Sequence, residues 1–466
     1  MSGSAPAWVT FTYIVTAMLF VVAIKRLRSV RSARSGNRLA MVGMGIAVVV
    51  VCQQAGLDNW SLIYPPMIVG AAIGTVAARQ VKMTAMPQMV ALFNGMGAGA
   101  AALIAAADFR RLDMLGSVPR LDGITILLSC MIGSIGFAGS MVAFAKLQEL
   151  IGGRPLVYPL QKPINAAILA TILVLGAVII ARQGGIELFV AFAVLSLVLG
   201  PLFVLPIGGA DMPVVISLLN SFTGVAAAIT GFVLDNQVLV VSGALVGASG
   251  TVLTQLMSRA MNRPLSNILF GAFGAVTAAG AGGAAEAGGE VRSATVEDVV
   301  ALFELARLVI VVPGYGLAVA RAQHDVKRLA DQLEARGIEV KYAIHPVAGR
   351  MPGHMNVLLA EADVPYSQLY DMDAINDEFS RADVAVVIGA NDVVNPAARN
   401  DPGSPIHGMP ILNVDQAANV VVLKRSMNPG FAGIENHLFY DPKTVMLFGD
   451  AQKSVSELVT ELKEAS

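Results

Sequence analysis

The stretch Leu308-Val-Ile-Val-Val-Pro-Gly-Tyr-Gly-Leu-Ala-Val-Ala320 decides how the second half of this chain folds. Its first residues are apolar and mostly β-branched, which favours a buried strand, and the glycines that follow favour a tight turn into a helix. A strand, a glycine turn and a helix in this order present backbone N–H groups to a phosphate. The stretch therefore predicts a dinucleotide site, although Val319 stands where the usual G-x-G-x-x-G pattern has its third glycine.

Strand and helix patterns alternate on both sides of this turn. Because such alternation is typical of parallel sheets covered by helices, we expect an α/β Rossmann-like, doubly wound parallel-sheet domain with its ligand at the carboxyl ends of the strands. The strands are predicted at 308–312, 339–345, 384–389, 410–413, 419–424 and 444–448, and the helices at 316–336, 371–381 and 452–464.

The first half of the chain has the composition of a membrane protein. The 466 residues are 55% hydrophobic and only 14% charged, whereas soluble domains are about 25% charged. Hydropathy predicts an α-helical polytopic membrane domain of about nine transmembrane helices. The net charge of −1 and the lack of a basic stripe argue against nucleic acid. The spans are predicted at 8–25, 39–56, 61–78, 86–107, 123–146, 164–182, 186–206, 211–233 and 237–257.

Two short connections test this count of spans. The tetrapeptide Arg182-Gln-Gly-Gly185 requires a tight hairpin between the sixth and seventh spans, and the loop 234–236 is short enough that two spans could merge. Cys52 and Cys130 lie in apolar segments without nearby metal ligands, so we expect buried hydrophobic residues and no metal site.

Basic residues predict which side of the membrane each loop faces. Six of them and no acid follow the first span, at Lys25, Arg26, Arg28, Arg31, Arg34 and Arg38. Loops rich in lysine and arginine stay in the cytoplasm, so an odd number of spans places the N-terminus outside and the C-terminal domain in the cytoplasm. The loop 108–122 departs from this trend with Arg110, Arg111 and Arg120 on the outer side.

Composition also predicts three regions. Residues 1–264 form the transmembrane domain, 265–294 a Gly/Ala-rich linker, and 295–466 a nucleotide-binding domain. Glycine is crowded into 271–289, which is typical of a flexible tether. A plain spacer and a hinge that lets the soluble domain move both fit this composition.

The polar residues at the predicted strand ends favour NADP over NAD. An acid that would bond the ribose 2′-OH of NAD is absent where the second strand ends at His345, and a later strand ends in Lys424-Arg425-Ser426. A 2′-phosphate prefers such donors, although a solvated strand end is the simpler alternative. Two further polar segments, 389–396 and 349–356, follow strands on the same expected side of the sheet.

These motifs resemble the beta subunit of proton-translocating NAD(P) transhydrogenase. The matching stretches are 313–320, 344–362, 387–397 and 424–428 in the soluble half, and 208–213, 217–221 and 243–247 in the membrane half. The resemblance implies a chain that binds NADP(H) and couples hydride transfer from NADH to NADP⁺ with inward proton translocation. It also implies an inner-membrane location in the lipid bilayer, a homodimer of assembled protomers, and an alpha-type partner subunit that carries the NAD(H) domain and additional membrane helices.

Motifs and resemblance together give the predicted site residues, none of them a catalytic acid or base. The cofactor-binding set is Gly314, Tyr315, Gly316, Ala318, Val319, His345, Gly349, Arg350, Gly389, Asn391, Asp392, Lys424, Arg425, Ser426, Gly430 and Phe431. The proton-path set is Asn94, Ser140, Asp211, Asn220 and Arg263. Buried asparagine and serine could equally be packing contacts between helices, and Asp211 and Arg263 could be interfacial anchors.

No histidine lies in the predicted spans, since all five fall after residue 323. Many relatives in the resembled family carry a membrane histidine where this chain has Asn94, and an amide cannot take up a proton near pH 7. We therefore expect the partner subunit to supply the titrating group; a relay through waters and Asp211 is the alternative. A competing interpretation of the whole chain is a membrane transporter or channel with a regulatory dinucleotide-sensing domain.

Overall fold

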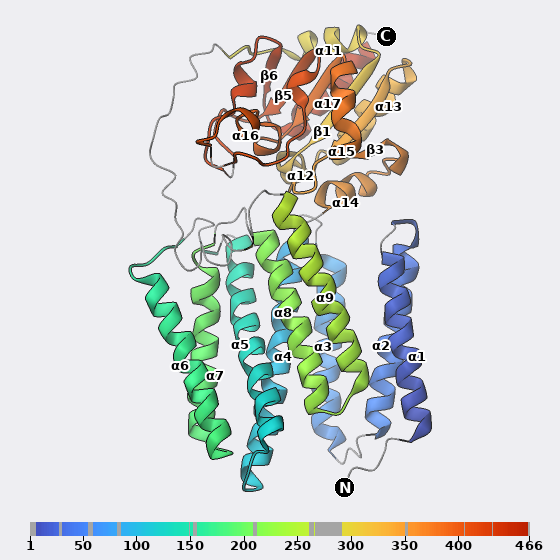
Figure 1. Cartoon of the computed structure of the whole chain (residues 1–466). Coiled ribbons are helices and arrows are strands. Elements are labelled where there is room, and N and C mark those ends of the chain that lie inside the picture. Colours follow the sequence, from blue (N-terminus) through green and yellow to red (C-terminus); the bar gives the residue numbers. More distant parts are fainter. Residues whose placement is uncertain are drawn as a thin grey trace. The chain divides into compact units, whose positions relative to one another are not determined.

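The structure is a computed structural model that forms two compact units, one helical and one built on a sheet (Figure 1). It describes residues 6–27, 30–54, 59–81, 85–148, 150–151, 156–207, 212–260, 265, 291–349, 353–404, 406–430 and 432–464.

The helical unit confirms the membrane prediction. Within the described residues, nine helices are long and apolar enough to cross a membrane. The loop at 234–236 does not merge two spans, because Asp235 adopts a left-handed φ of 49° and separates α8 from α9. The helices are α1 (Ala7–Leu27), α2 (Val30–Gln54), α3 (Trp60–Gln80), α4 (Met86–Met114), α5 (Arg120–Leu147), α6 (Gln161–Arg182), α7 (Ile186–Val204), α8 (Met212–Val233) and α9 (Gln237–Ala260).

Several helices are longer than hydropathy predicts, because helical hydrogen bonds continue through polar residues at the span ends. Lys25 and Arg26 form the last turn of α1, and Arg34 and Arg38 belong to α2. Much of the basic cluster therefore lies on helices rather than in a loop. The hairpin between α6 and α7 is as tight as expected, and the backbone N–H of Gly185 donates to Asp113 Oδ1 (2.8 Å).

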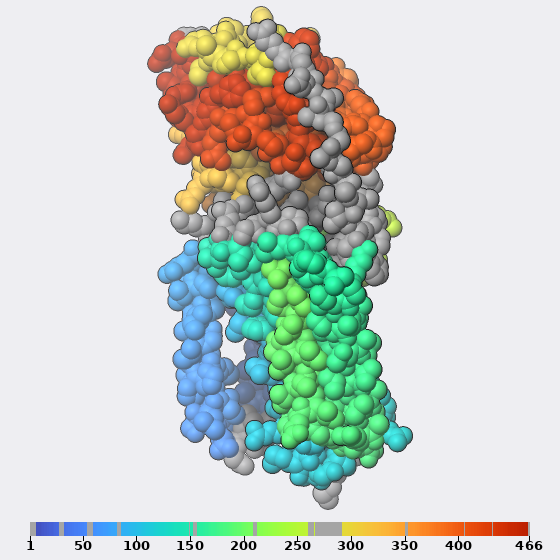
Figure 2. Space-filling view, turned by 90° about the vertical axis from the view of Figure 1, so that its left-hand side faces the viewer, coloured from blue at the N-terminus to red at the C-terminus, as the bar shows by residue number. Residues whose placement is uncertain are grey.

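Burial differs sharply among the helices. In its most apolar window α5 is 61% buried, whereas no residue of α3 is buried. Figure 2 shows a side of the helical unit on which α3, in light blue, is exposed along its length. Among the nine helices, α5 is therefore the one packed most fully inside the unit.

Glycines bring α8 and α9 into close contact. A Cβ at Gly224 would lie 2.4 Å from the backbone N of Gly247, and a Cβ at Gly243 would lie 2.4 Å from the backbone N of Ala228. No side chain fits in that space, so the small residues of α9 act as a packing surface, as their spacing indicates.

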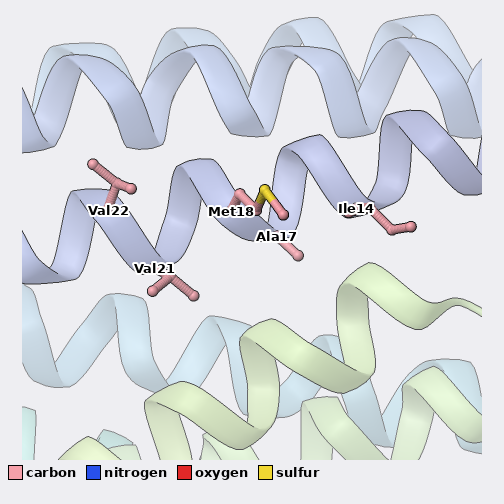
Figure 3. Close-up of a pocket in the computed structure, with 5 residues that line it drawn as sticks. All are labelled: Ile14, Ala17, Met18, Val21 and Val22. Carbon is pink, nitrogen blue, oxygen red and sulfur yellow. The ribbon is translucent and has the colours of Figure 1, made fainter.

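A shallow groove on α1 is entirely apolar (Figure 3). Its lining side chains are Ile14, Ala17, Met18, Val21 and Val22. Because none of them carries a polar group, this groove suits a lipid or helix surface and not a nucleotide or proton site.

The second unit contains a six-stranded, wholly parallel sheet in the order β3-β2-β1-β4-β5-β6, which confirms the predicted fold class. The order reverses direction between β1 and β4, so the crevice where such folds bind ligands lies at the carboxyl ends of these two strands. The strands are β1 (Leu308–Pro313), β2 (Glu339–Ile344), β3 (Leu369–Asp371), β4 (Val384–Ile388), β5 (Asn419–Lys424) and β6 (Thr444–Phe448).

Helices cover the sheet and bury its central strands. Every residue of β1 and β4 is buried, as the apolar runs in the sequence predict for a two-sided sheet. The helices are α11 (Val296–Glu304), α12 (Tyr315–Ala320), α13 (Gln323–Ala335), α14 (His354–Glu361), α15 (Met372–Ile375), α16 (Ala397–Asn400) and α17 (Ala451–Glu464). Before α11, Ala294 N donates to Met446 O (2.9 Å) beside β6.

Two details of the α/β prediction were wrong. Residues 410–413 are not a strand, because the side chain of Asn376 bonds the backbone there, donating to Ile411 O and accepting from Asn413 N (both 3.0 Å). The edge strand is instead β3, a three-residue segment too short to show a period. The predicted helix 316–336 is divided, because Arg321 has φ of 55° and ends α12.

Candidate functional site

Two glycine turns meet at the reversal point of the sheet. After β1, the backbone N–H groups of Gly314 and Gly316 donate to Ile388 O and Gly389 O at the end of β4 (both 2.9 Å). A Cβ at Gly314 would lie 2.3 Å from the backbone N of Ala390, and one at Gly316 would lie 2.7 Å from Gly389 Cα. These glycines are therefore needed for contact between the two turns, and their own N–H groups are already bonded.

The rest of the first turn is open toward solvent. Tyr315 is partly exposed and Val319 is 44% exposed, whereas Ala318 is buried. Val319, which replaces the third glycine of the G-x-G-x-x-G pattern, is thus a surface residue of α12. The turn after β1 is accessible to a ligand on that side.

Polar residues that follow β4 and β5 form one connected cluster. The side-chain amide of Asn391 lies 3.2 Å from Lys424 Nζ and 2.8 Å from the backbone N of Gly430. Asp392 Oδ2 accepts from Ala432 N (3.0 Å). A Cβ at Gly430 would lie 2.6 Å from Asp392 Oδ1, so glycine lets the backbone at this position approach the carboxylate.

Lys424 is the central cation of this cluster. It is half-buried at the end of β5, with Nζ 5.0 Å from the ring centroid of Phe439, and it donates to Asn428 O. Burial lowers the pKa of Lys424 from its usual value, and the nearby Asp392 carboxylate opposes that shift. The ammonium is therefore held in place by a ring, an amide and a carbonyl.

Arg425 and Ser426 continue directly from Lys424 and are exposed. Ser426 Oγ accepts from Asn428 N (3.4 Å). Among the residues that the structure describes, Arg425 has no ion-pair partner. A guanidinium of this kind can bond a phosphate in a bidentate manner without first breaking a contact within the protein.

His345, which follows β2, is buried, and both of its ring nitrogens take part in hydrogen bonds. Its side chain is 1% exposed; Nε2 lies 2.8 Å from Pro410 O, and Nδ1 accepts from Val347 N (3.3 Å). These bonds fix the neutral tautomer with its proton on Nε2, and burial lowers the pKa of His345 to about 4. Gly349 (φ 100°) packs against buried His354, since a Cβ would lie 2.3 Å from its Nδ1.

Two residues of the site were not found from the sequence. Asn436 is buried, donates to the backbone carbonyl of Asn391 (3.1 Å) and accepts from Leu438 N (3.0 Å), and Phe439 lies beneath Lys424. Neither belongs to a glycine-marked turn, so no local signal identifies them. Arg350 and Phe431, both in the predicted set, lie outside the described residues.

The membrane set is only partly brought together. Asn94 of α4 donates from Nδ2 to Ser140 Oγ of α5 (3.0 Å), both side chains are buried, and Asn94 Oδ1 has no partner among the described residues. Asn220 is partly buried, between a face of α8 that contacts α4 and α5 and a face that contacts α9. Asp211 and Arg263 lie outside the described residues.

Serines and threonines join α8 to α9 near Asn220. Ser217 accepts from Thr254 Oγ1 (3.0 Å), and Ser221 Oγ lies 2.7 Å from Thr251 Oγ1. Ser217 and Gly224 therefore face α9. No group of three His, Cys, Asp or Glu side chains capable of holding a metal occurs within the described parts of the chain.

The carboxyl edge of β1, β4 and β5 suits an anionic nucleotide. A partly exposed glycine turn lies at the reversal point of the sheet, and the half-buried Lys424 and the exposed Arg425-Ser426 pair follow the neighbouring strand β5 at the same edge. That arrangement supplies charged donors for a phosphate beside a partly exposed turn.

Comparison with known proteins agrees with this geometry. A family described as NAD(P) transhydrogenase beta subunit matches residues 9–461. Two relatives named NAD(P) transhydrogenase subunit beta, both from Rhodospirillum rubrum, are each 47% identical over 452 residues, which cover 96% of this chain and 97% of the relative. This multi-pass membrane chain therefore belongs to the NAD(P) transhydrogenase beta subunit family.

Proposed function

We propose that this chain is the NADP(H)-binding and membrane subunit of a transhydrogenase, which couples hydride transfer from NADH to NADP⁺ with inward proton movement. The family membership supports the activity. The observation that carries the nucleotide assignment is the exposed Arg425-Ser426 pair beside half-buried Lys424, at the carboxyl end of the strand next to the reversal point of the sheet.

Lys424, Arg425 and Ser426 would hold the 2′-phosphate of the nucleotide, and the edge from Gly314 to Val319 would lie against its pyrophosphate. Charge-assisted hydrogen bonds are each worth about 1.5–3 kcal/mol. Asn391 and Asp392 would keep the 424–432 segment in position, and His345 would hold the end of β2 to the 410 segment. When bound, the nicotinamide supplies the hydride chemistry, so the protein needs no acid or base for that transfer.

The second substrate site is assigned to an alpha-type partner subunit. This chain has one doubly wound sheet with one reversal point among its described residues, and hydride exchange requires two nucleotides. The partner would bring the NAD(H) domain and further membrane helices, and the assembled protomers would form a homodimer.

Proton movement is assigned to the polar contact between α4 and α5. Asn94 and Ser140 form a buried hydrogen bond in the helical unit, and Asp211, Asn220 and Arg263 are proposed as further members of the path. An amide and a hydroxyl can order waters but do not titrate near pH 7. We therefore place the titrating group on the partner subunit.

The membrane potential would set the direction of the reaction. One inward proton contributes about 2.3 kcal/mol per 100 mV, and a potential of about 150 mV therefore shifts the nucleotide ratio several hundredfold. This requires the sheet domain in the cytoplasm and the N-terminus outside the inner membrane, the orientation proposed from the basic residues around α1 and α2.

A turnover measurement tests this function. Vesicles that contain this chain and its alpha-type partner are supplied with NADH and an oxidised NADP analogue, and the absorbance of the reduced analogue is followed together with the internal pH. We expect reduction accompanied by proton movement. Binding of the analogue without turnover would instead support the transporter or channel with a sensing domain.

A further inference from the structure

A buried cation lies at one end of the contact between α4 and α5. Lys146, next to the last residue of α5, is only 3% exposed. Its Nζ donates to Leu205 O (2.5 Å) and Ile207 O (2.7 Å), in the segment that follows α7. Both acceptors are neutral carbonyls, and among the described residues no acid is paired with Lys146.

Lys146 is exceptional among the buried polar side chains of the membrane unit. Within the described parts of α1–α9 these include asparagines, glutamines, serines and threonines, and Lys146 is the one member that carries a charge. Lysines near span ends usually extend their ammonium to water. Lys162 of α6, which is exposed, fits that description, whereas buried Lys146 does not.

The same end of the α4–α5 pair is closed by a second polar group. Gln88 of α4 is buried, donates from Nε2 to Leu147 O (3.0 Å), and its Oε1 has no partner among the described residues. Leu205 O, one acceptor of Lys146, also accepts from Leu156 N (3.0 Å). Chain segments that are distant in the sequence are therefore joined around the ammonium.

This polar layer lies on the same two helices as the Asn94–Ser140 contact, farther along their axes. Asn94 follows Gln88 by six residues and Ser140 precedes Lys146 by six. At 1.5 Å of rise per residue the backbone of Lys146 is about 9 Å along the helix axis from Ser140. Farther along α5, Ser129 Oγ lies 2.7 Å from Thr230 Oγ1 of α8, so polar side chains continue on the far side of the contact.

A fixed positive charge beside a polar path opposes entry of a proton. Its effect is large where water is excluded, because charges interact more strongly at low dielectric, and pores exclude protons in the same way with positive groups. Two carbonyl bonds hold the ammonium in position, so movement of the Leu205–Ile207 segment would also move the charge.

We propose that Lys146 is an electrostatic gate at one end of the proton path, and that it prevents protons from crossing without turnover. The proposal rests on the proposed function, since it assumes that protons pass the Asn94–Ser140 contact. Lys146 is a positioning and charge residue in this account, and it exchanges no proton itself.

The test is the passive proton leak of vesicles that contain the complete complex. The chain and its alpha-type partner are reconstituted, a pH gradient is imposed without nucleotides, and its decay is followed with an internal pH dye. For Lys146→Met we expect decay roughly twentyfold faster, from one unit charge about 9 Å away at an effective dielectric constant of about 20. Lys146→Arg, which keeps the charge, should match the unsubstituted complex.

Lys162→Met is the matched control, because it removes an exposed lysine from the same end of the bundle. A Lys146→Met complex that assembles and holds the gradient as well as the unsubstituted one would overturn the gate. If the methionine variant does not assemble, the proton leak is measured instead with Lys146→Gln, which removes the charge but keeps a hydrogen-bond donor. If neither the methionine nor the glutamine variant assembles while the arginine variant behaves normally, Lys146 is needed to hold the structure together. That result would also overturn the gate.

Failure of the proposed function is a separate outcome. It is measured on the unsubstituted complex, as absence of proton movement during hydride transfer in the same vesicles. Suppose that the unsubstituted complex transfers hydride with proton movement and that the Lys146→Met variant holds the pH gradient equally well. These two results would contradict the gate but not the proposed function.

Discussion

Gly389→Ala should damage both stability and nucleotide binding, because the glycine turns after β1 and β4 are in backbone contact. Gly389 has φ of 64°, and a Cβ there would lie 2.3 Å from Gly316 Cα. Gly337 provides a matched control: its φ is 82°, nothing lies within 4 Å of an added Cβ, and it is located before β2 at the opposite edge of the sheet.

Both substitutions carry the cost of a left-handed backbone conformation, and only Gly389→Ala also carries the cost of overpacking. A left-handed conformation costs a non-glycine residue about 1–2 kcal/mol. Ordinary van der Waals contact begins at 3.4 Å, so alanine at 389 must open the contact by 3.4 − 2.3 = 1.1 Å. Overpacking of that kind costs about 1–3 kcal/mol more. We expect a loss of about 2–5 kcal/mol for Gly389→Ala and about 1–2 kcal/mol for Gly337→Ala.

The assay uses the segment from about residue 290 to 466, which we expect to be soluble when expressed alone. Urea unfolding gives the loss of stability, and calorimetric titration with NADPH gives the affinity. Gly389→Ala should bind at least about tenfold more weakly, since the displaced turns lie at the site, whereas Gly337→Ala should bind as the parent does. Equal losses of stability and equal affinities for the two variants would refute the backbone contact and the placement of the site beside it.

Three further expectations follow from the site and the membrane contact. Arg425→Ala should narrow the preference for NADPH over NADH at least about tenfold, because one charge-assisted phosphate contact is lost, and titration with both nucleotides would reveal an unchanged preference if the assignment is wrong. His345 has its folded pKa lowered to about 4 from an unfolded value near 6.5; the unfolded chain therefore takes up a proton first, and stability should fall by about 3 kcal/mol as the pH drops from 6.5 to 4. His345→Gln should remove this dependence of the unfolding free energy on pH, whereas His324→Gln should keep it. The same dependence in the parent and in both variants would contradict the burial argument. Asn94→Ala and Ser140→Ala should slow turnover but leave its pH midpoint nearly unchanged, because neither group titrates, and a shifted midpoint would contradict this role.

The sequence was informative wherever a backbone requirement selects a residue type. Gly314 and Gly316 mark the turn at the reversal point because no Cβ fits there, and the apolar runs of β1 and β4 are buried on both faces. The nine spans were equally clear, because the hydrocarbon thickness fixes their length.

Tertiary contacts were not predictable in the same way. Asn376 bonds the backbone of 411 and 413 from a distant part of the chain and prevents a strand that the local pattern favours. Asn436 and Phe439 complete the surroundings of Asn391 and Lys424 without any local motif. The role of His345 also depends on a distant partner, Pro410 O, which occupies its Nε2.

The most direct test of the account is the relative affinity of this chain for NADPH and NADH. The purified full chain, kept in detergent, is titrated with each nucleotide in turn by calorimetry at the same salt concentration. We predict that NADPH binds at least about tenfold more tightly, because its 2′-phosphate gains charge-assisted bonds to Lys424, Arg425 and Ser426. Equal affinity for NADPH and NADH, or tighter binding of NADH, would contradict it.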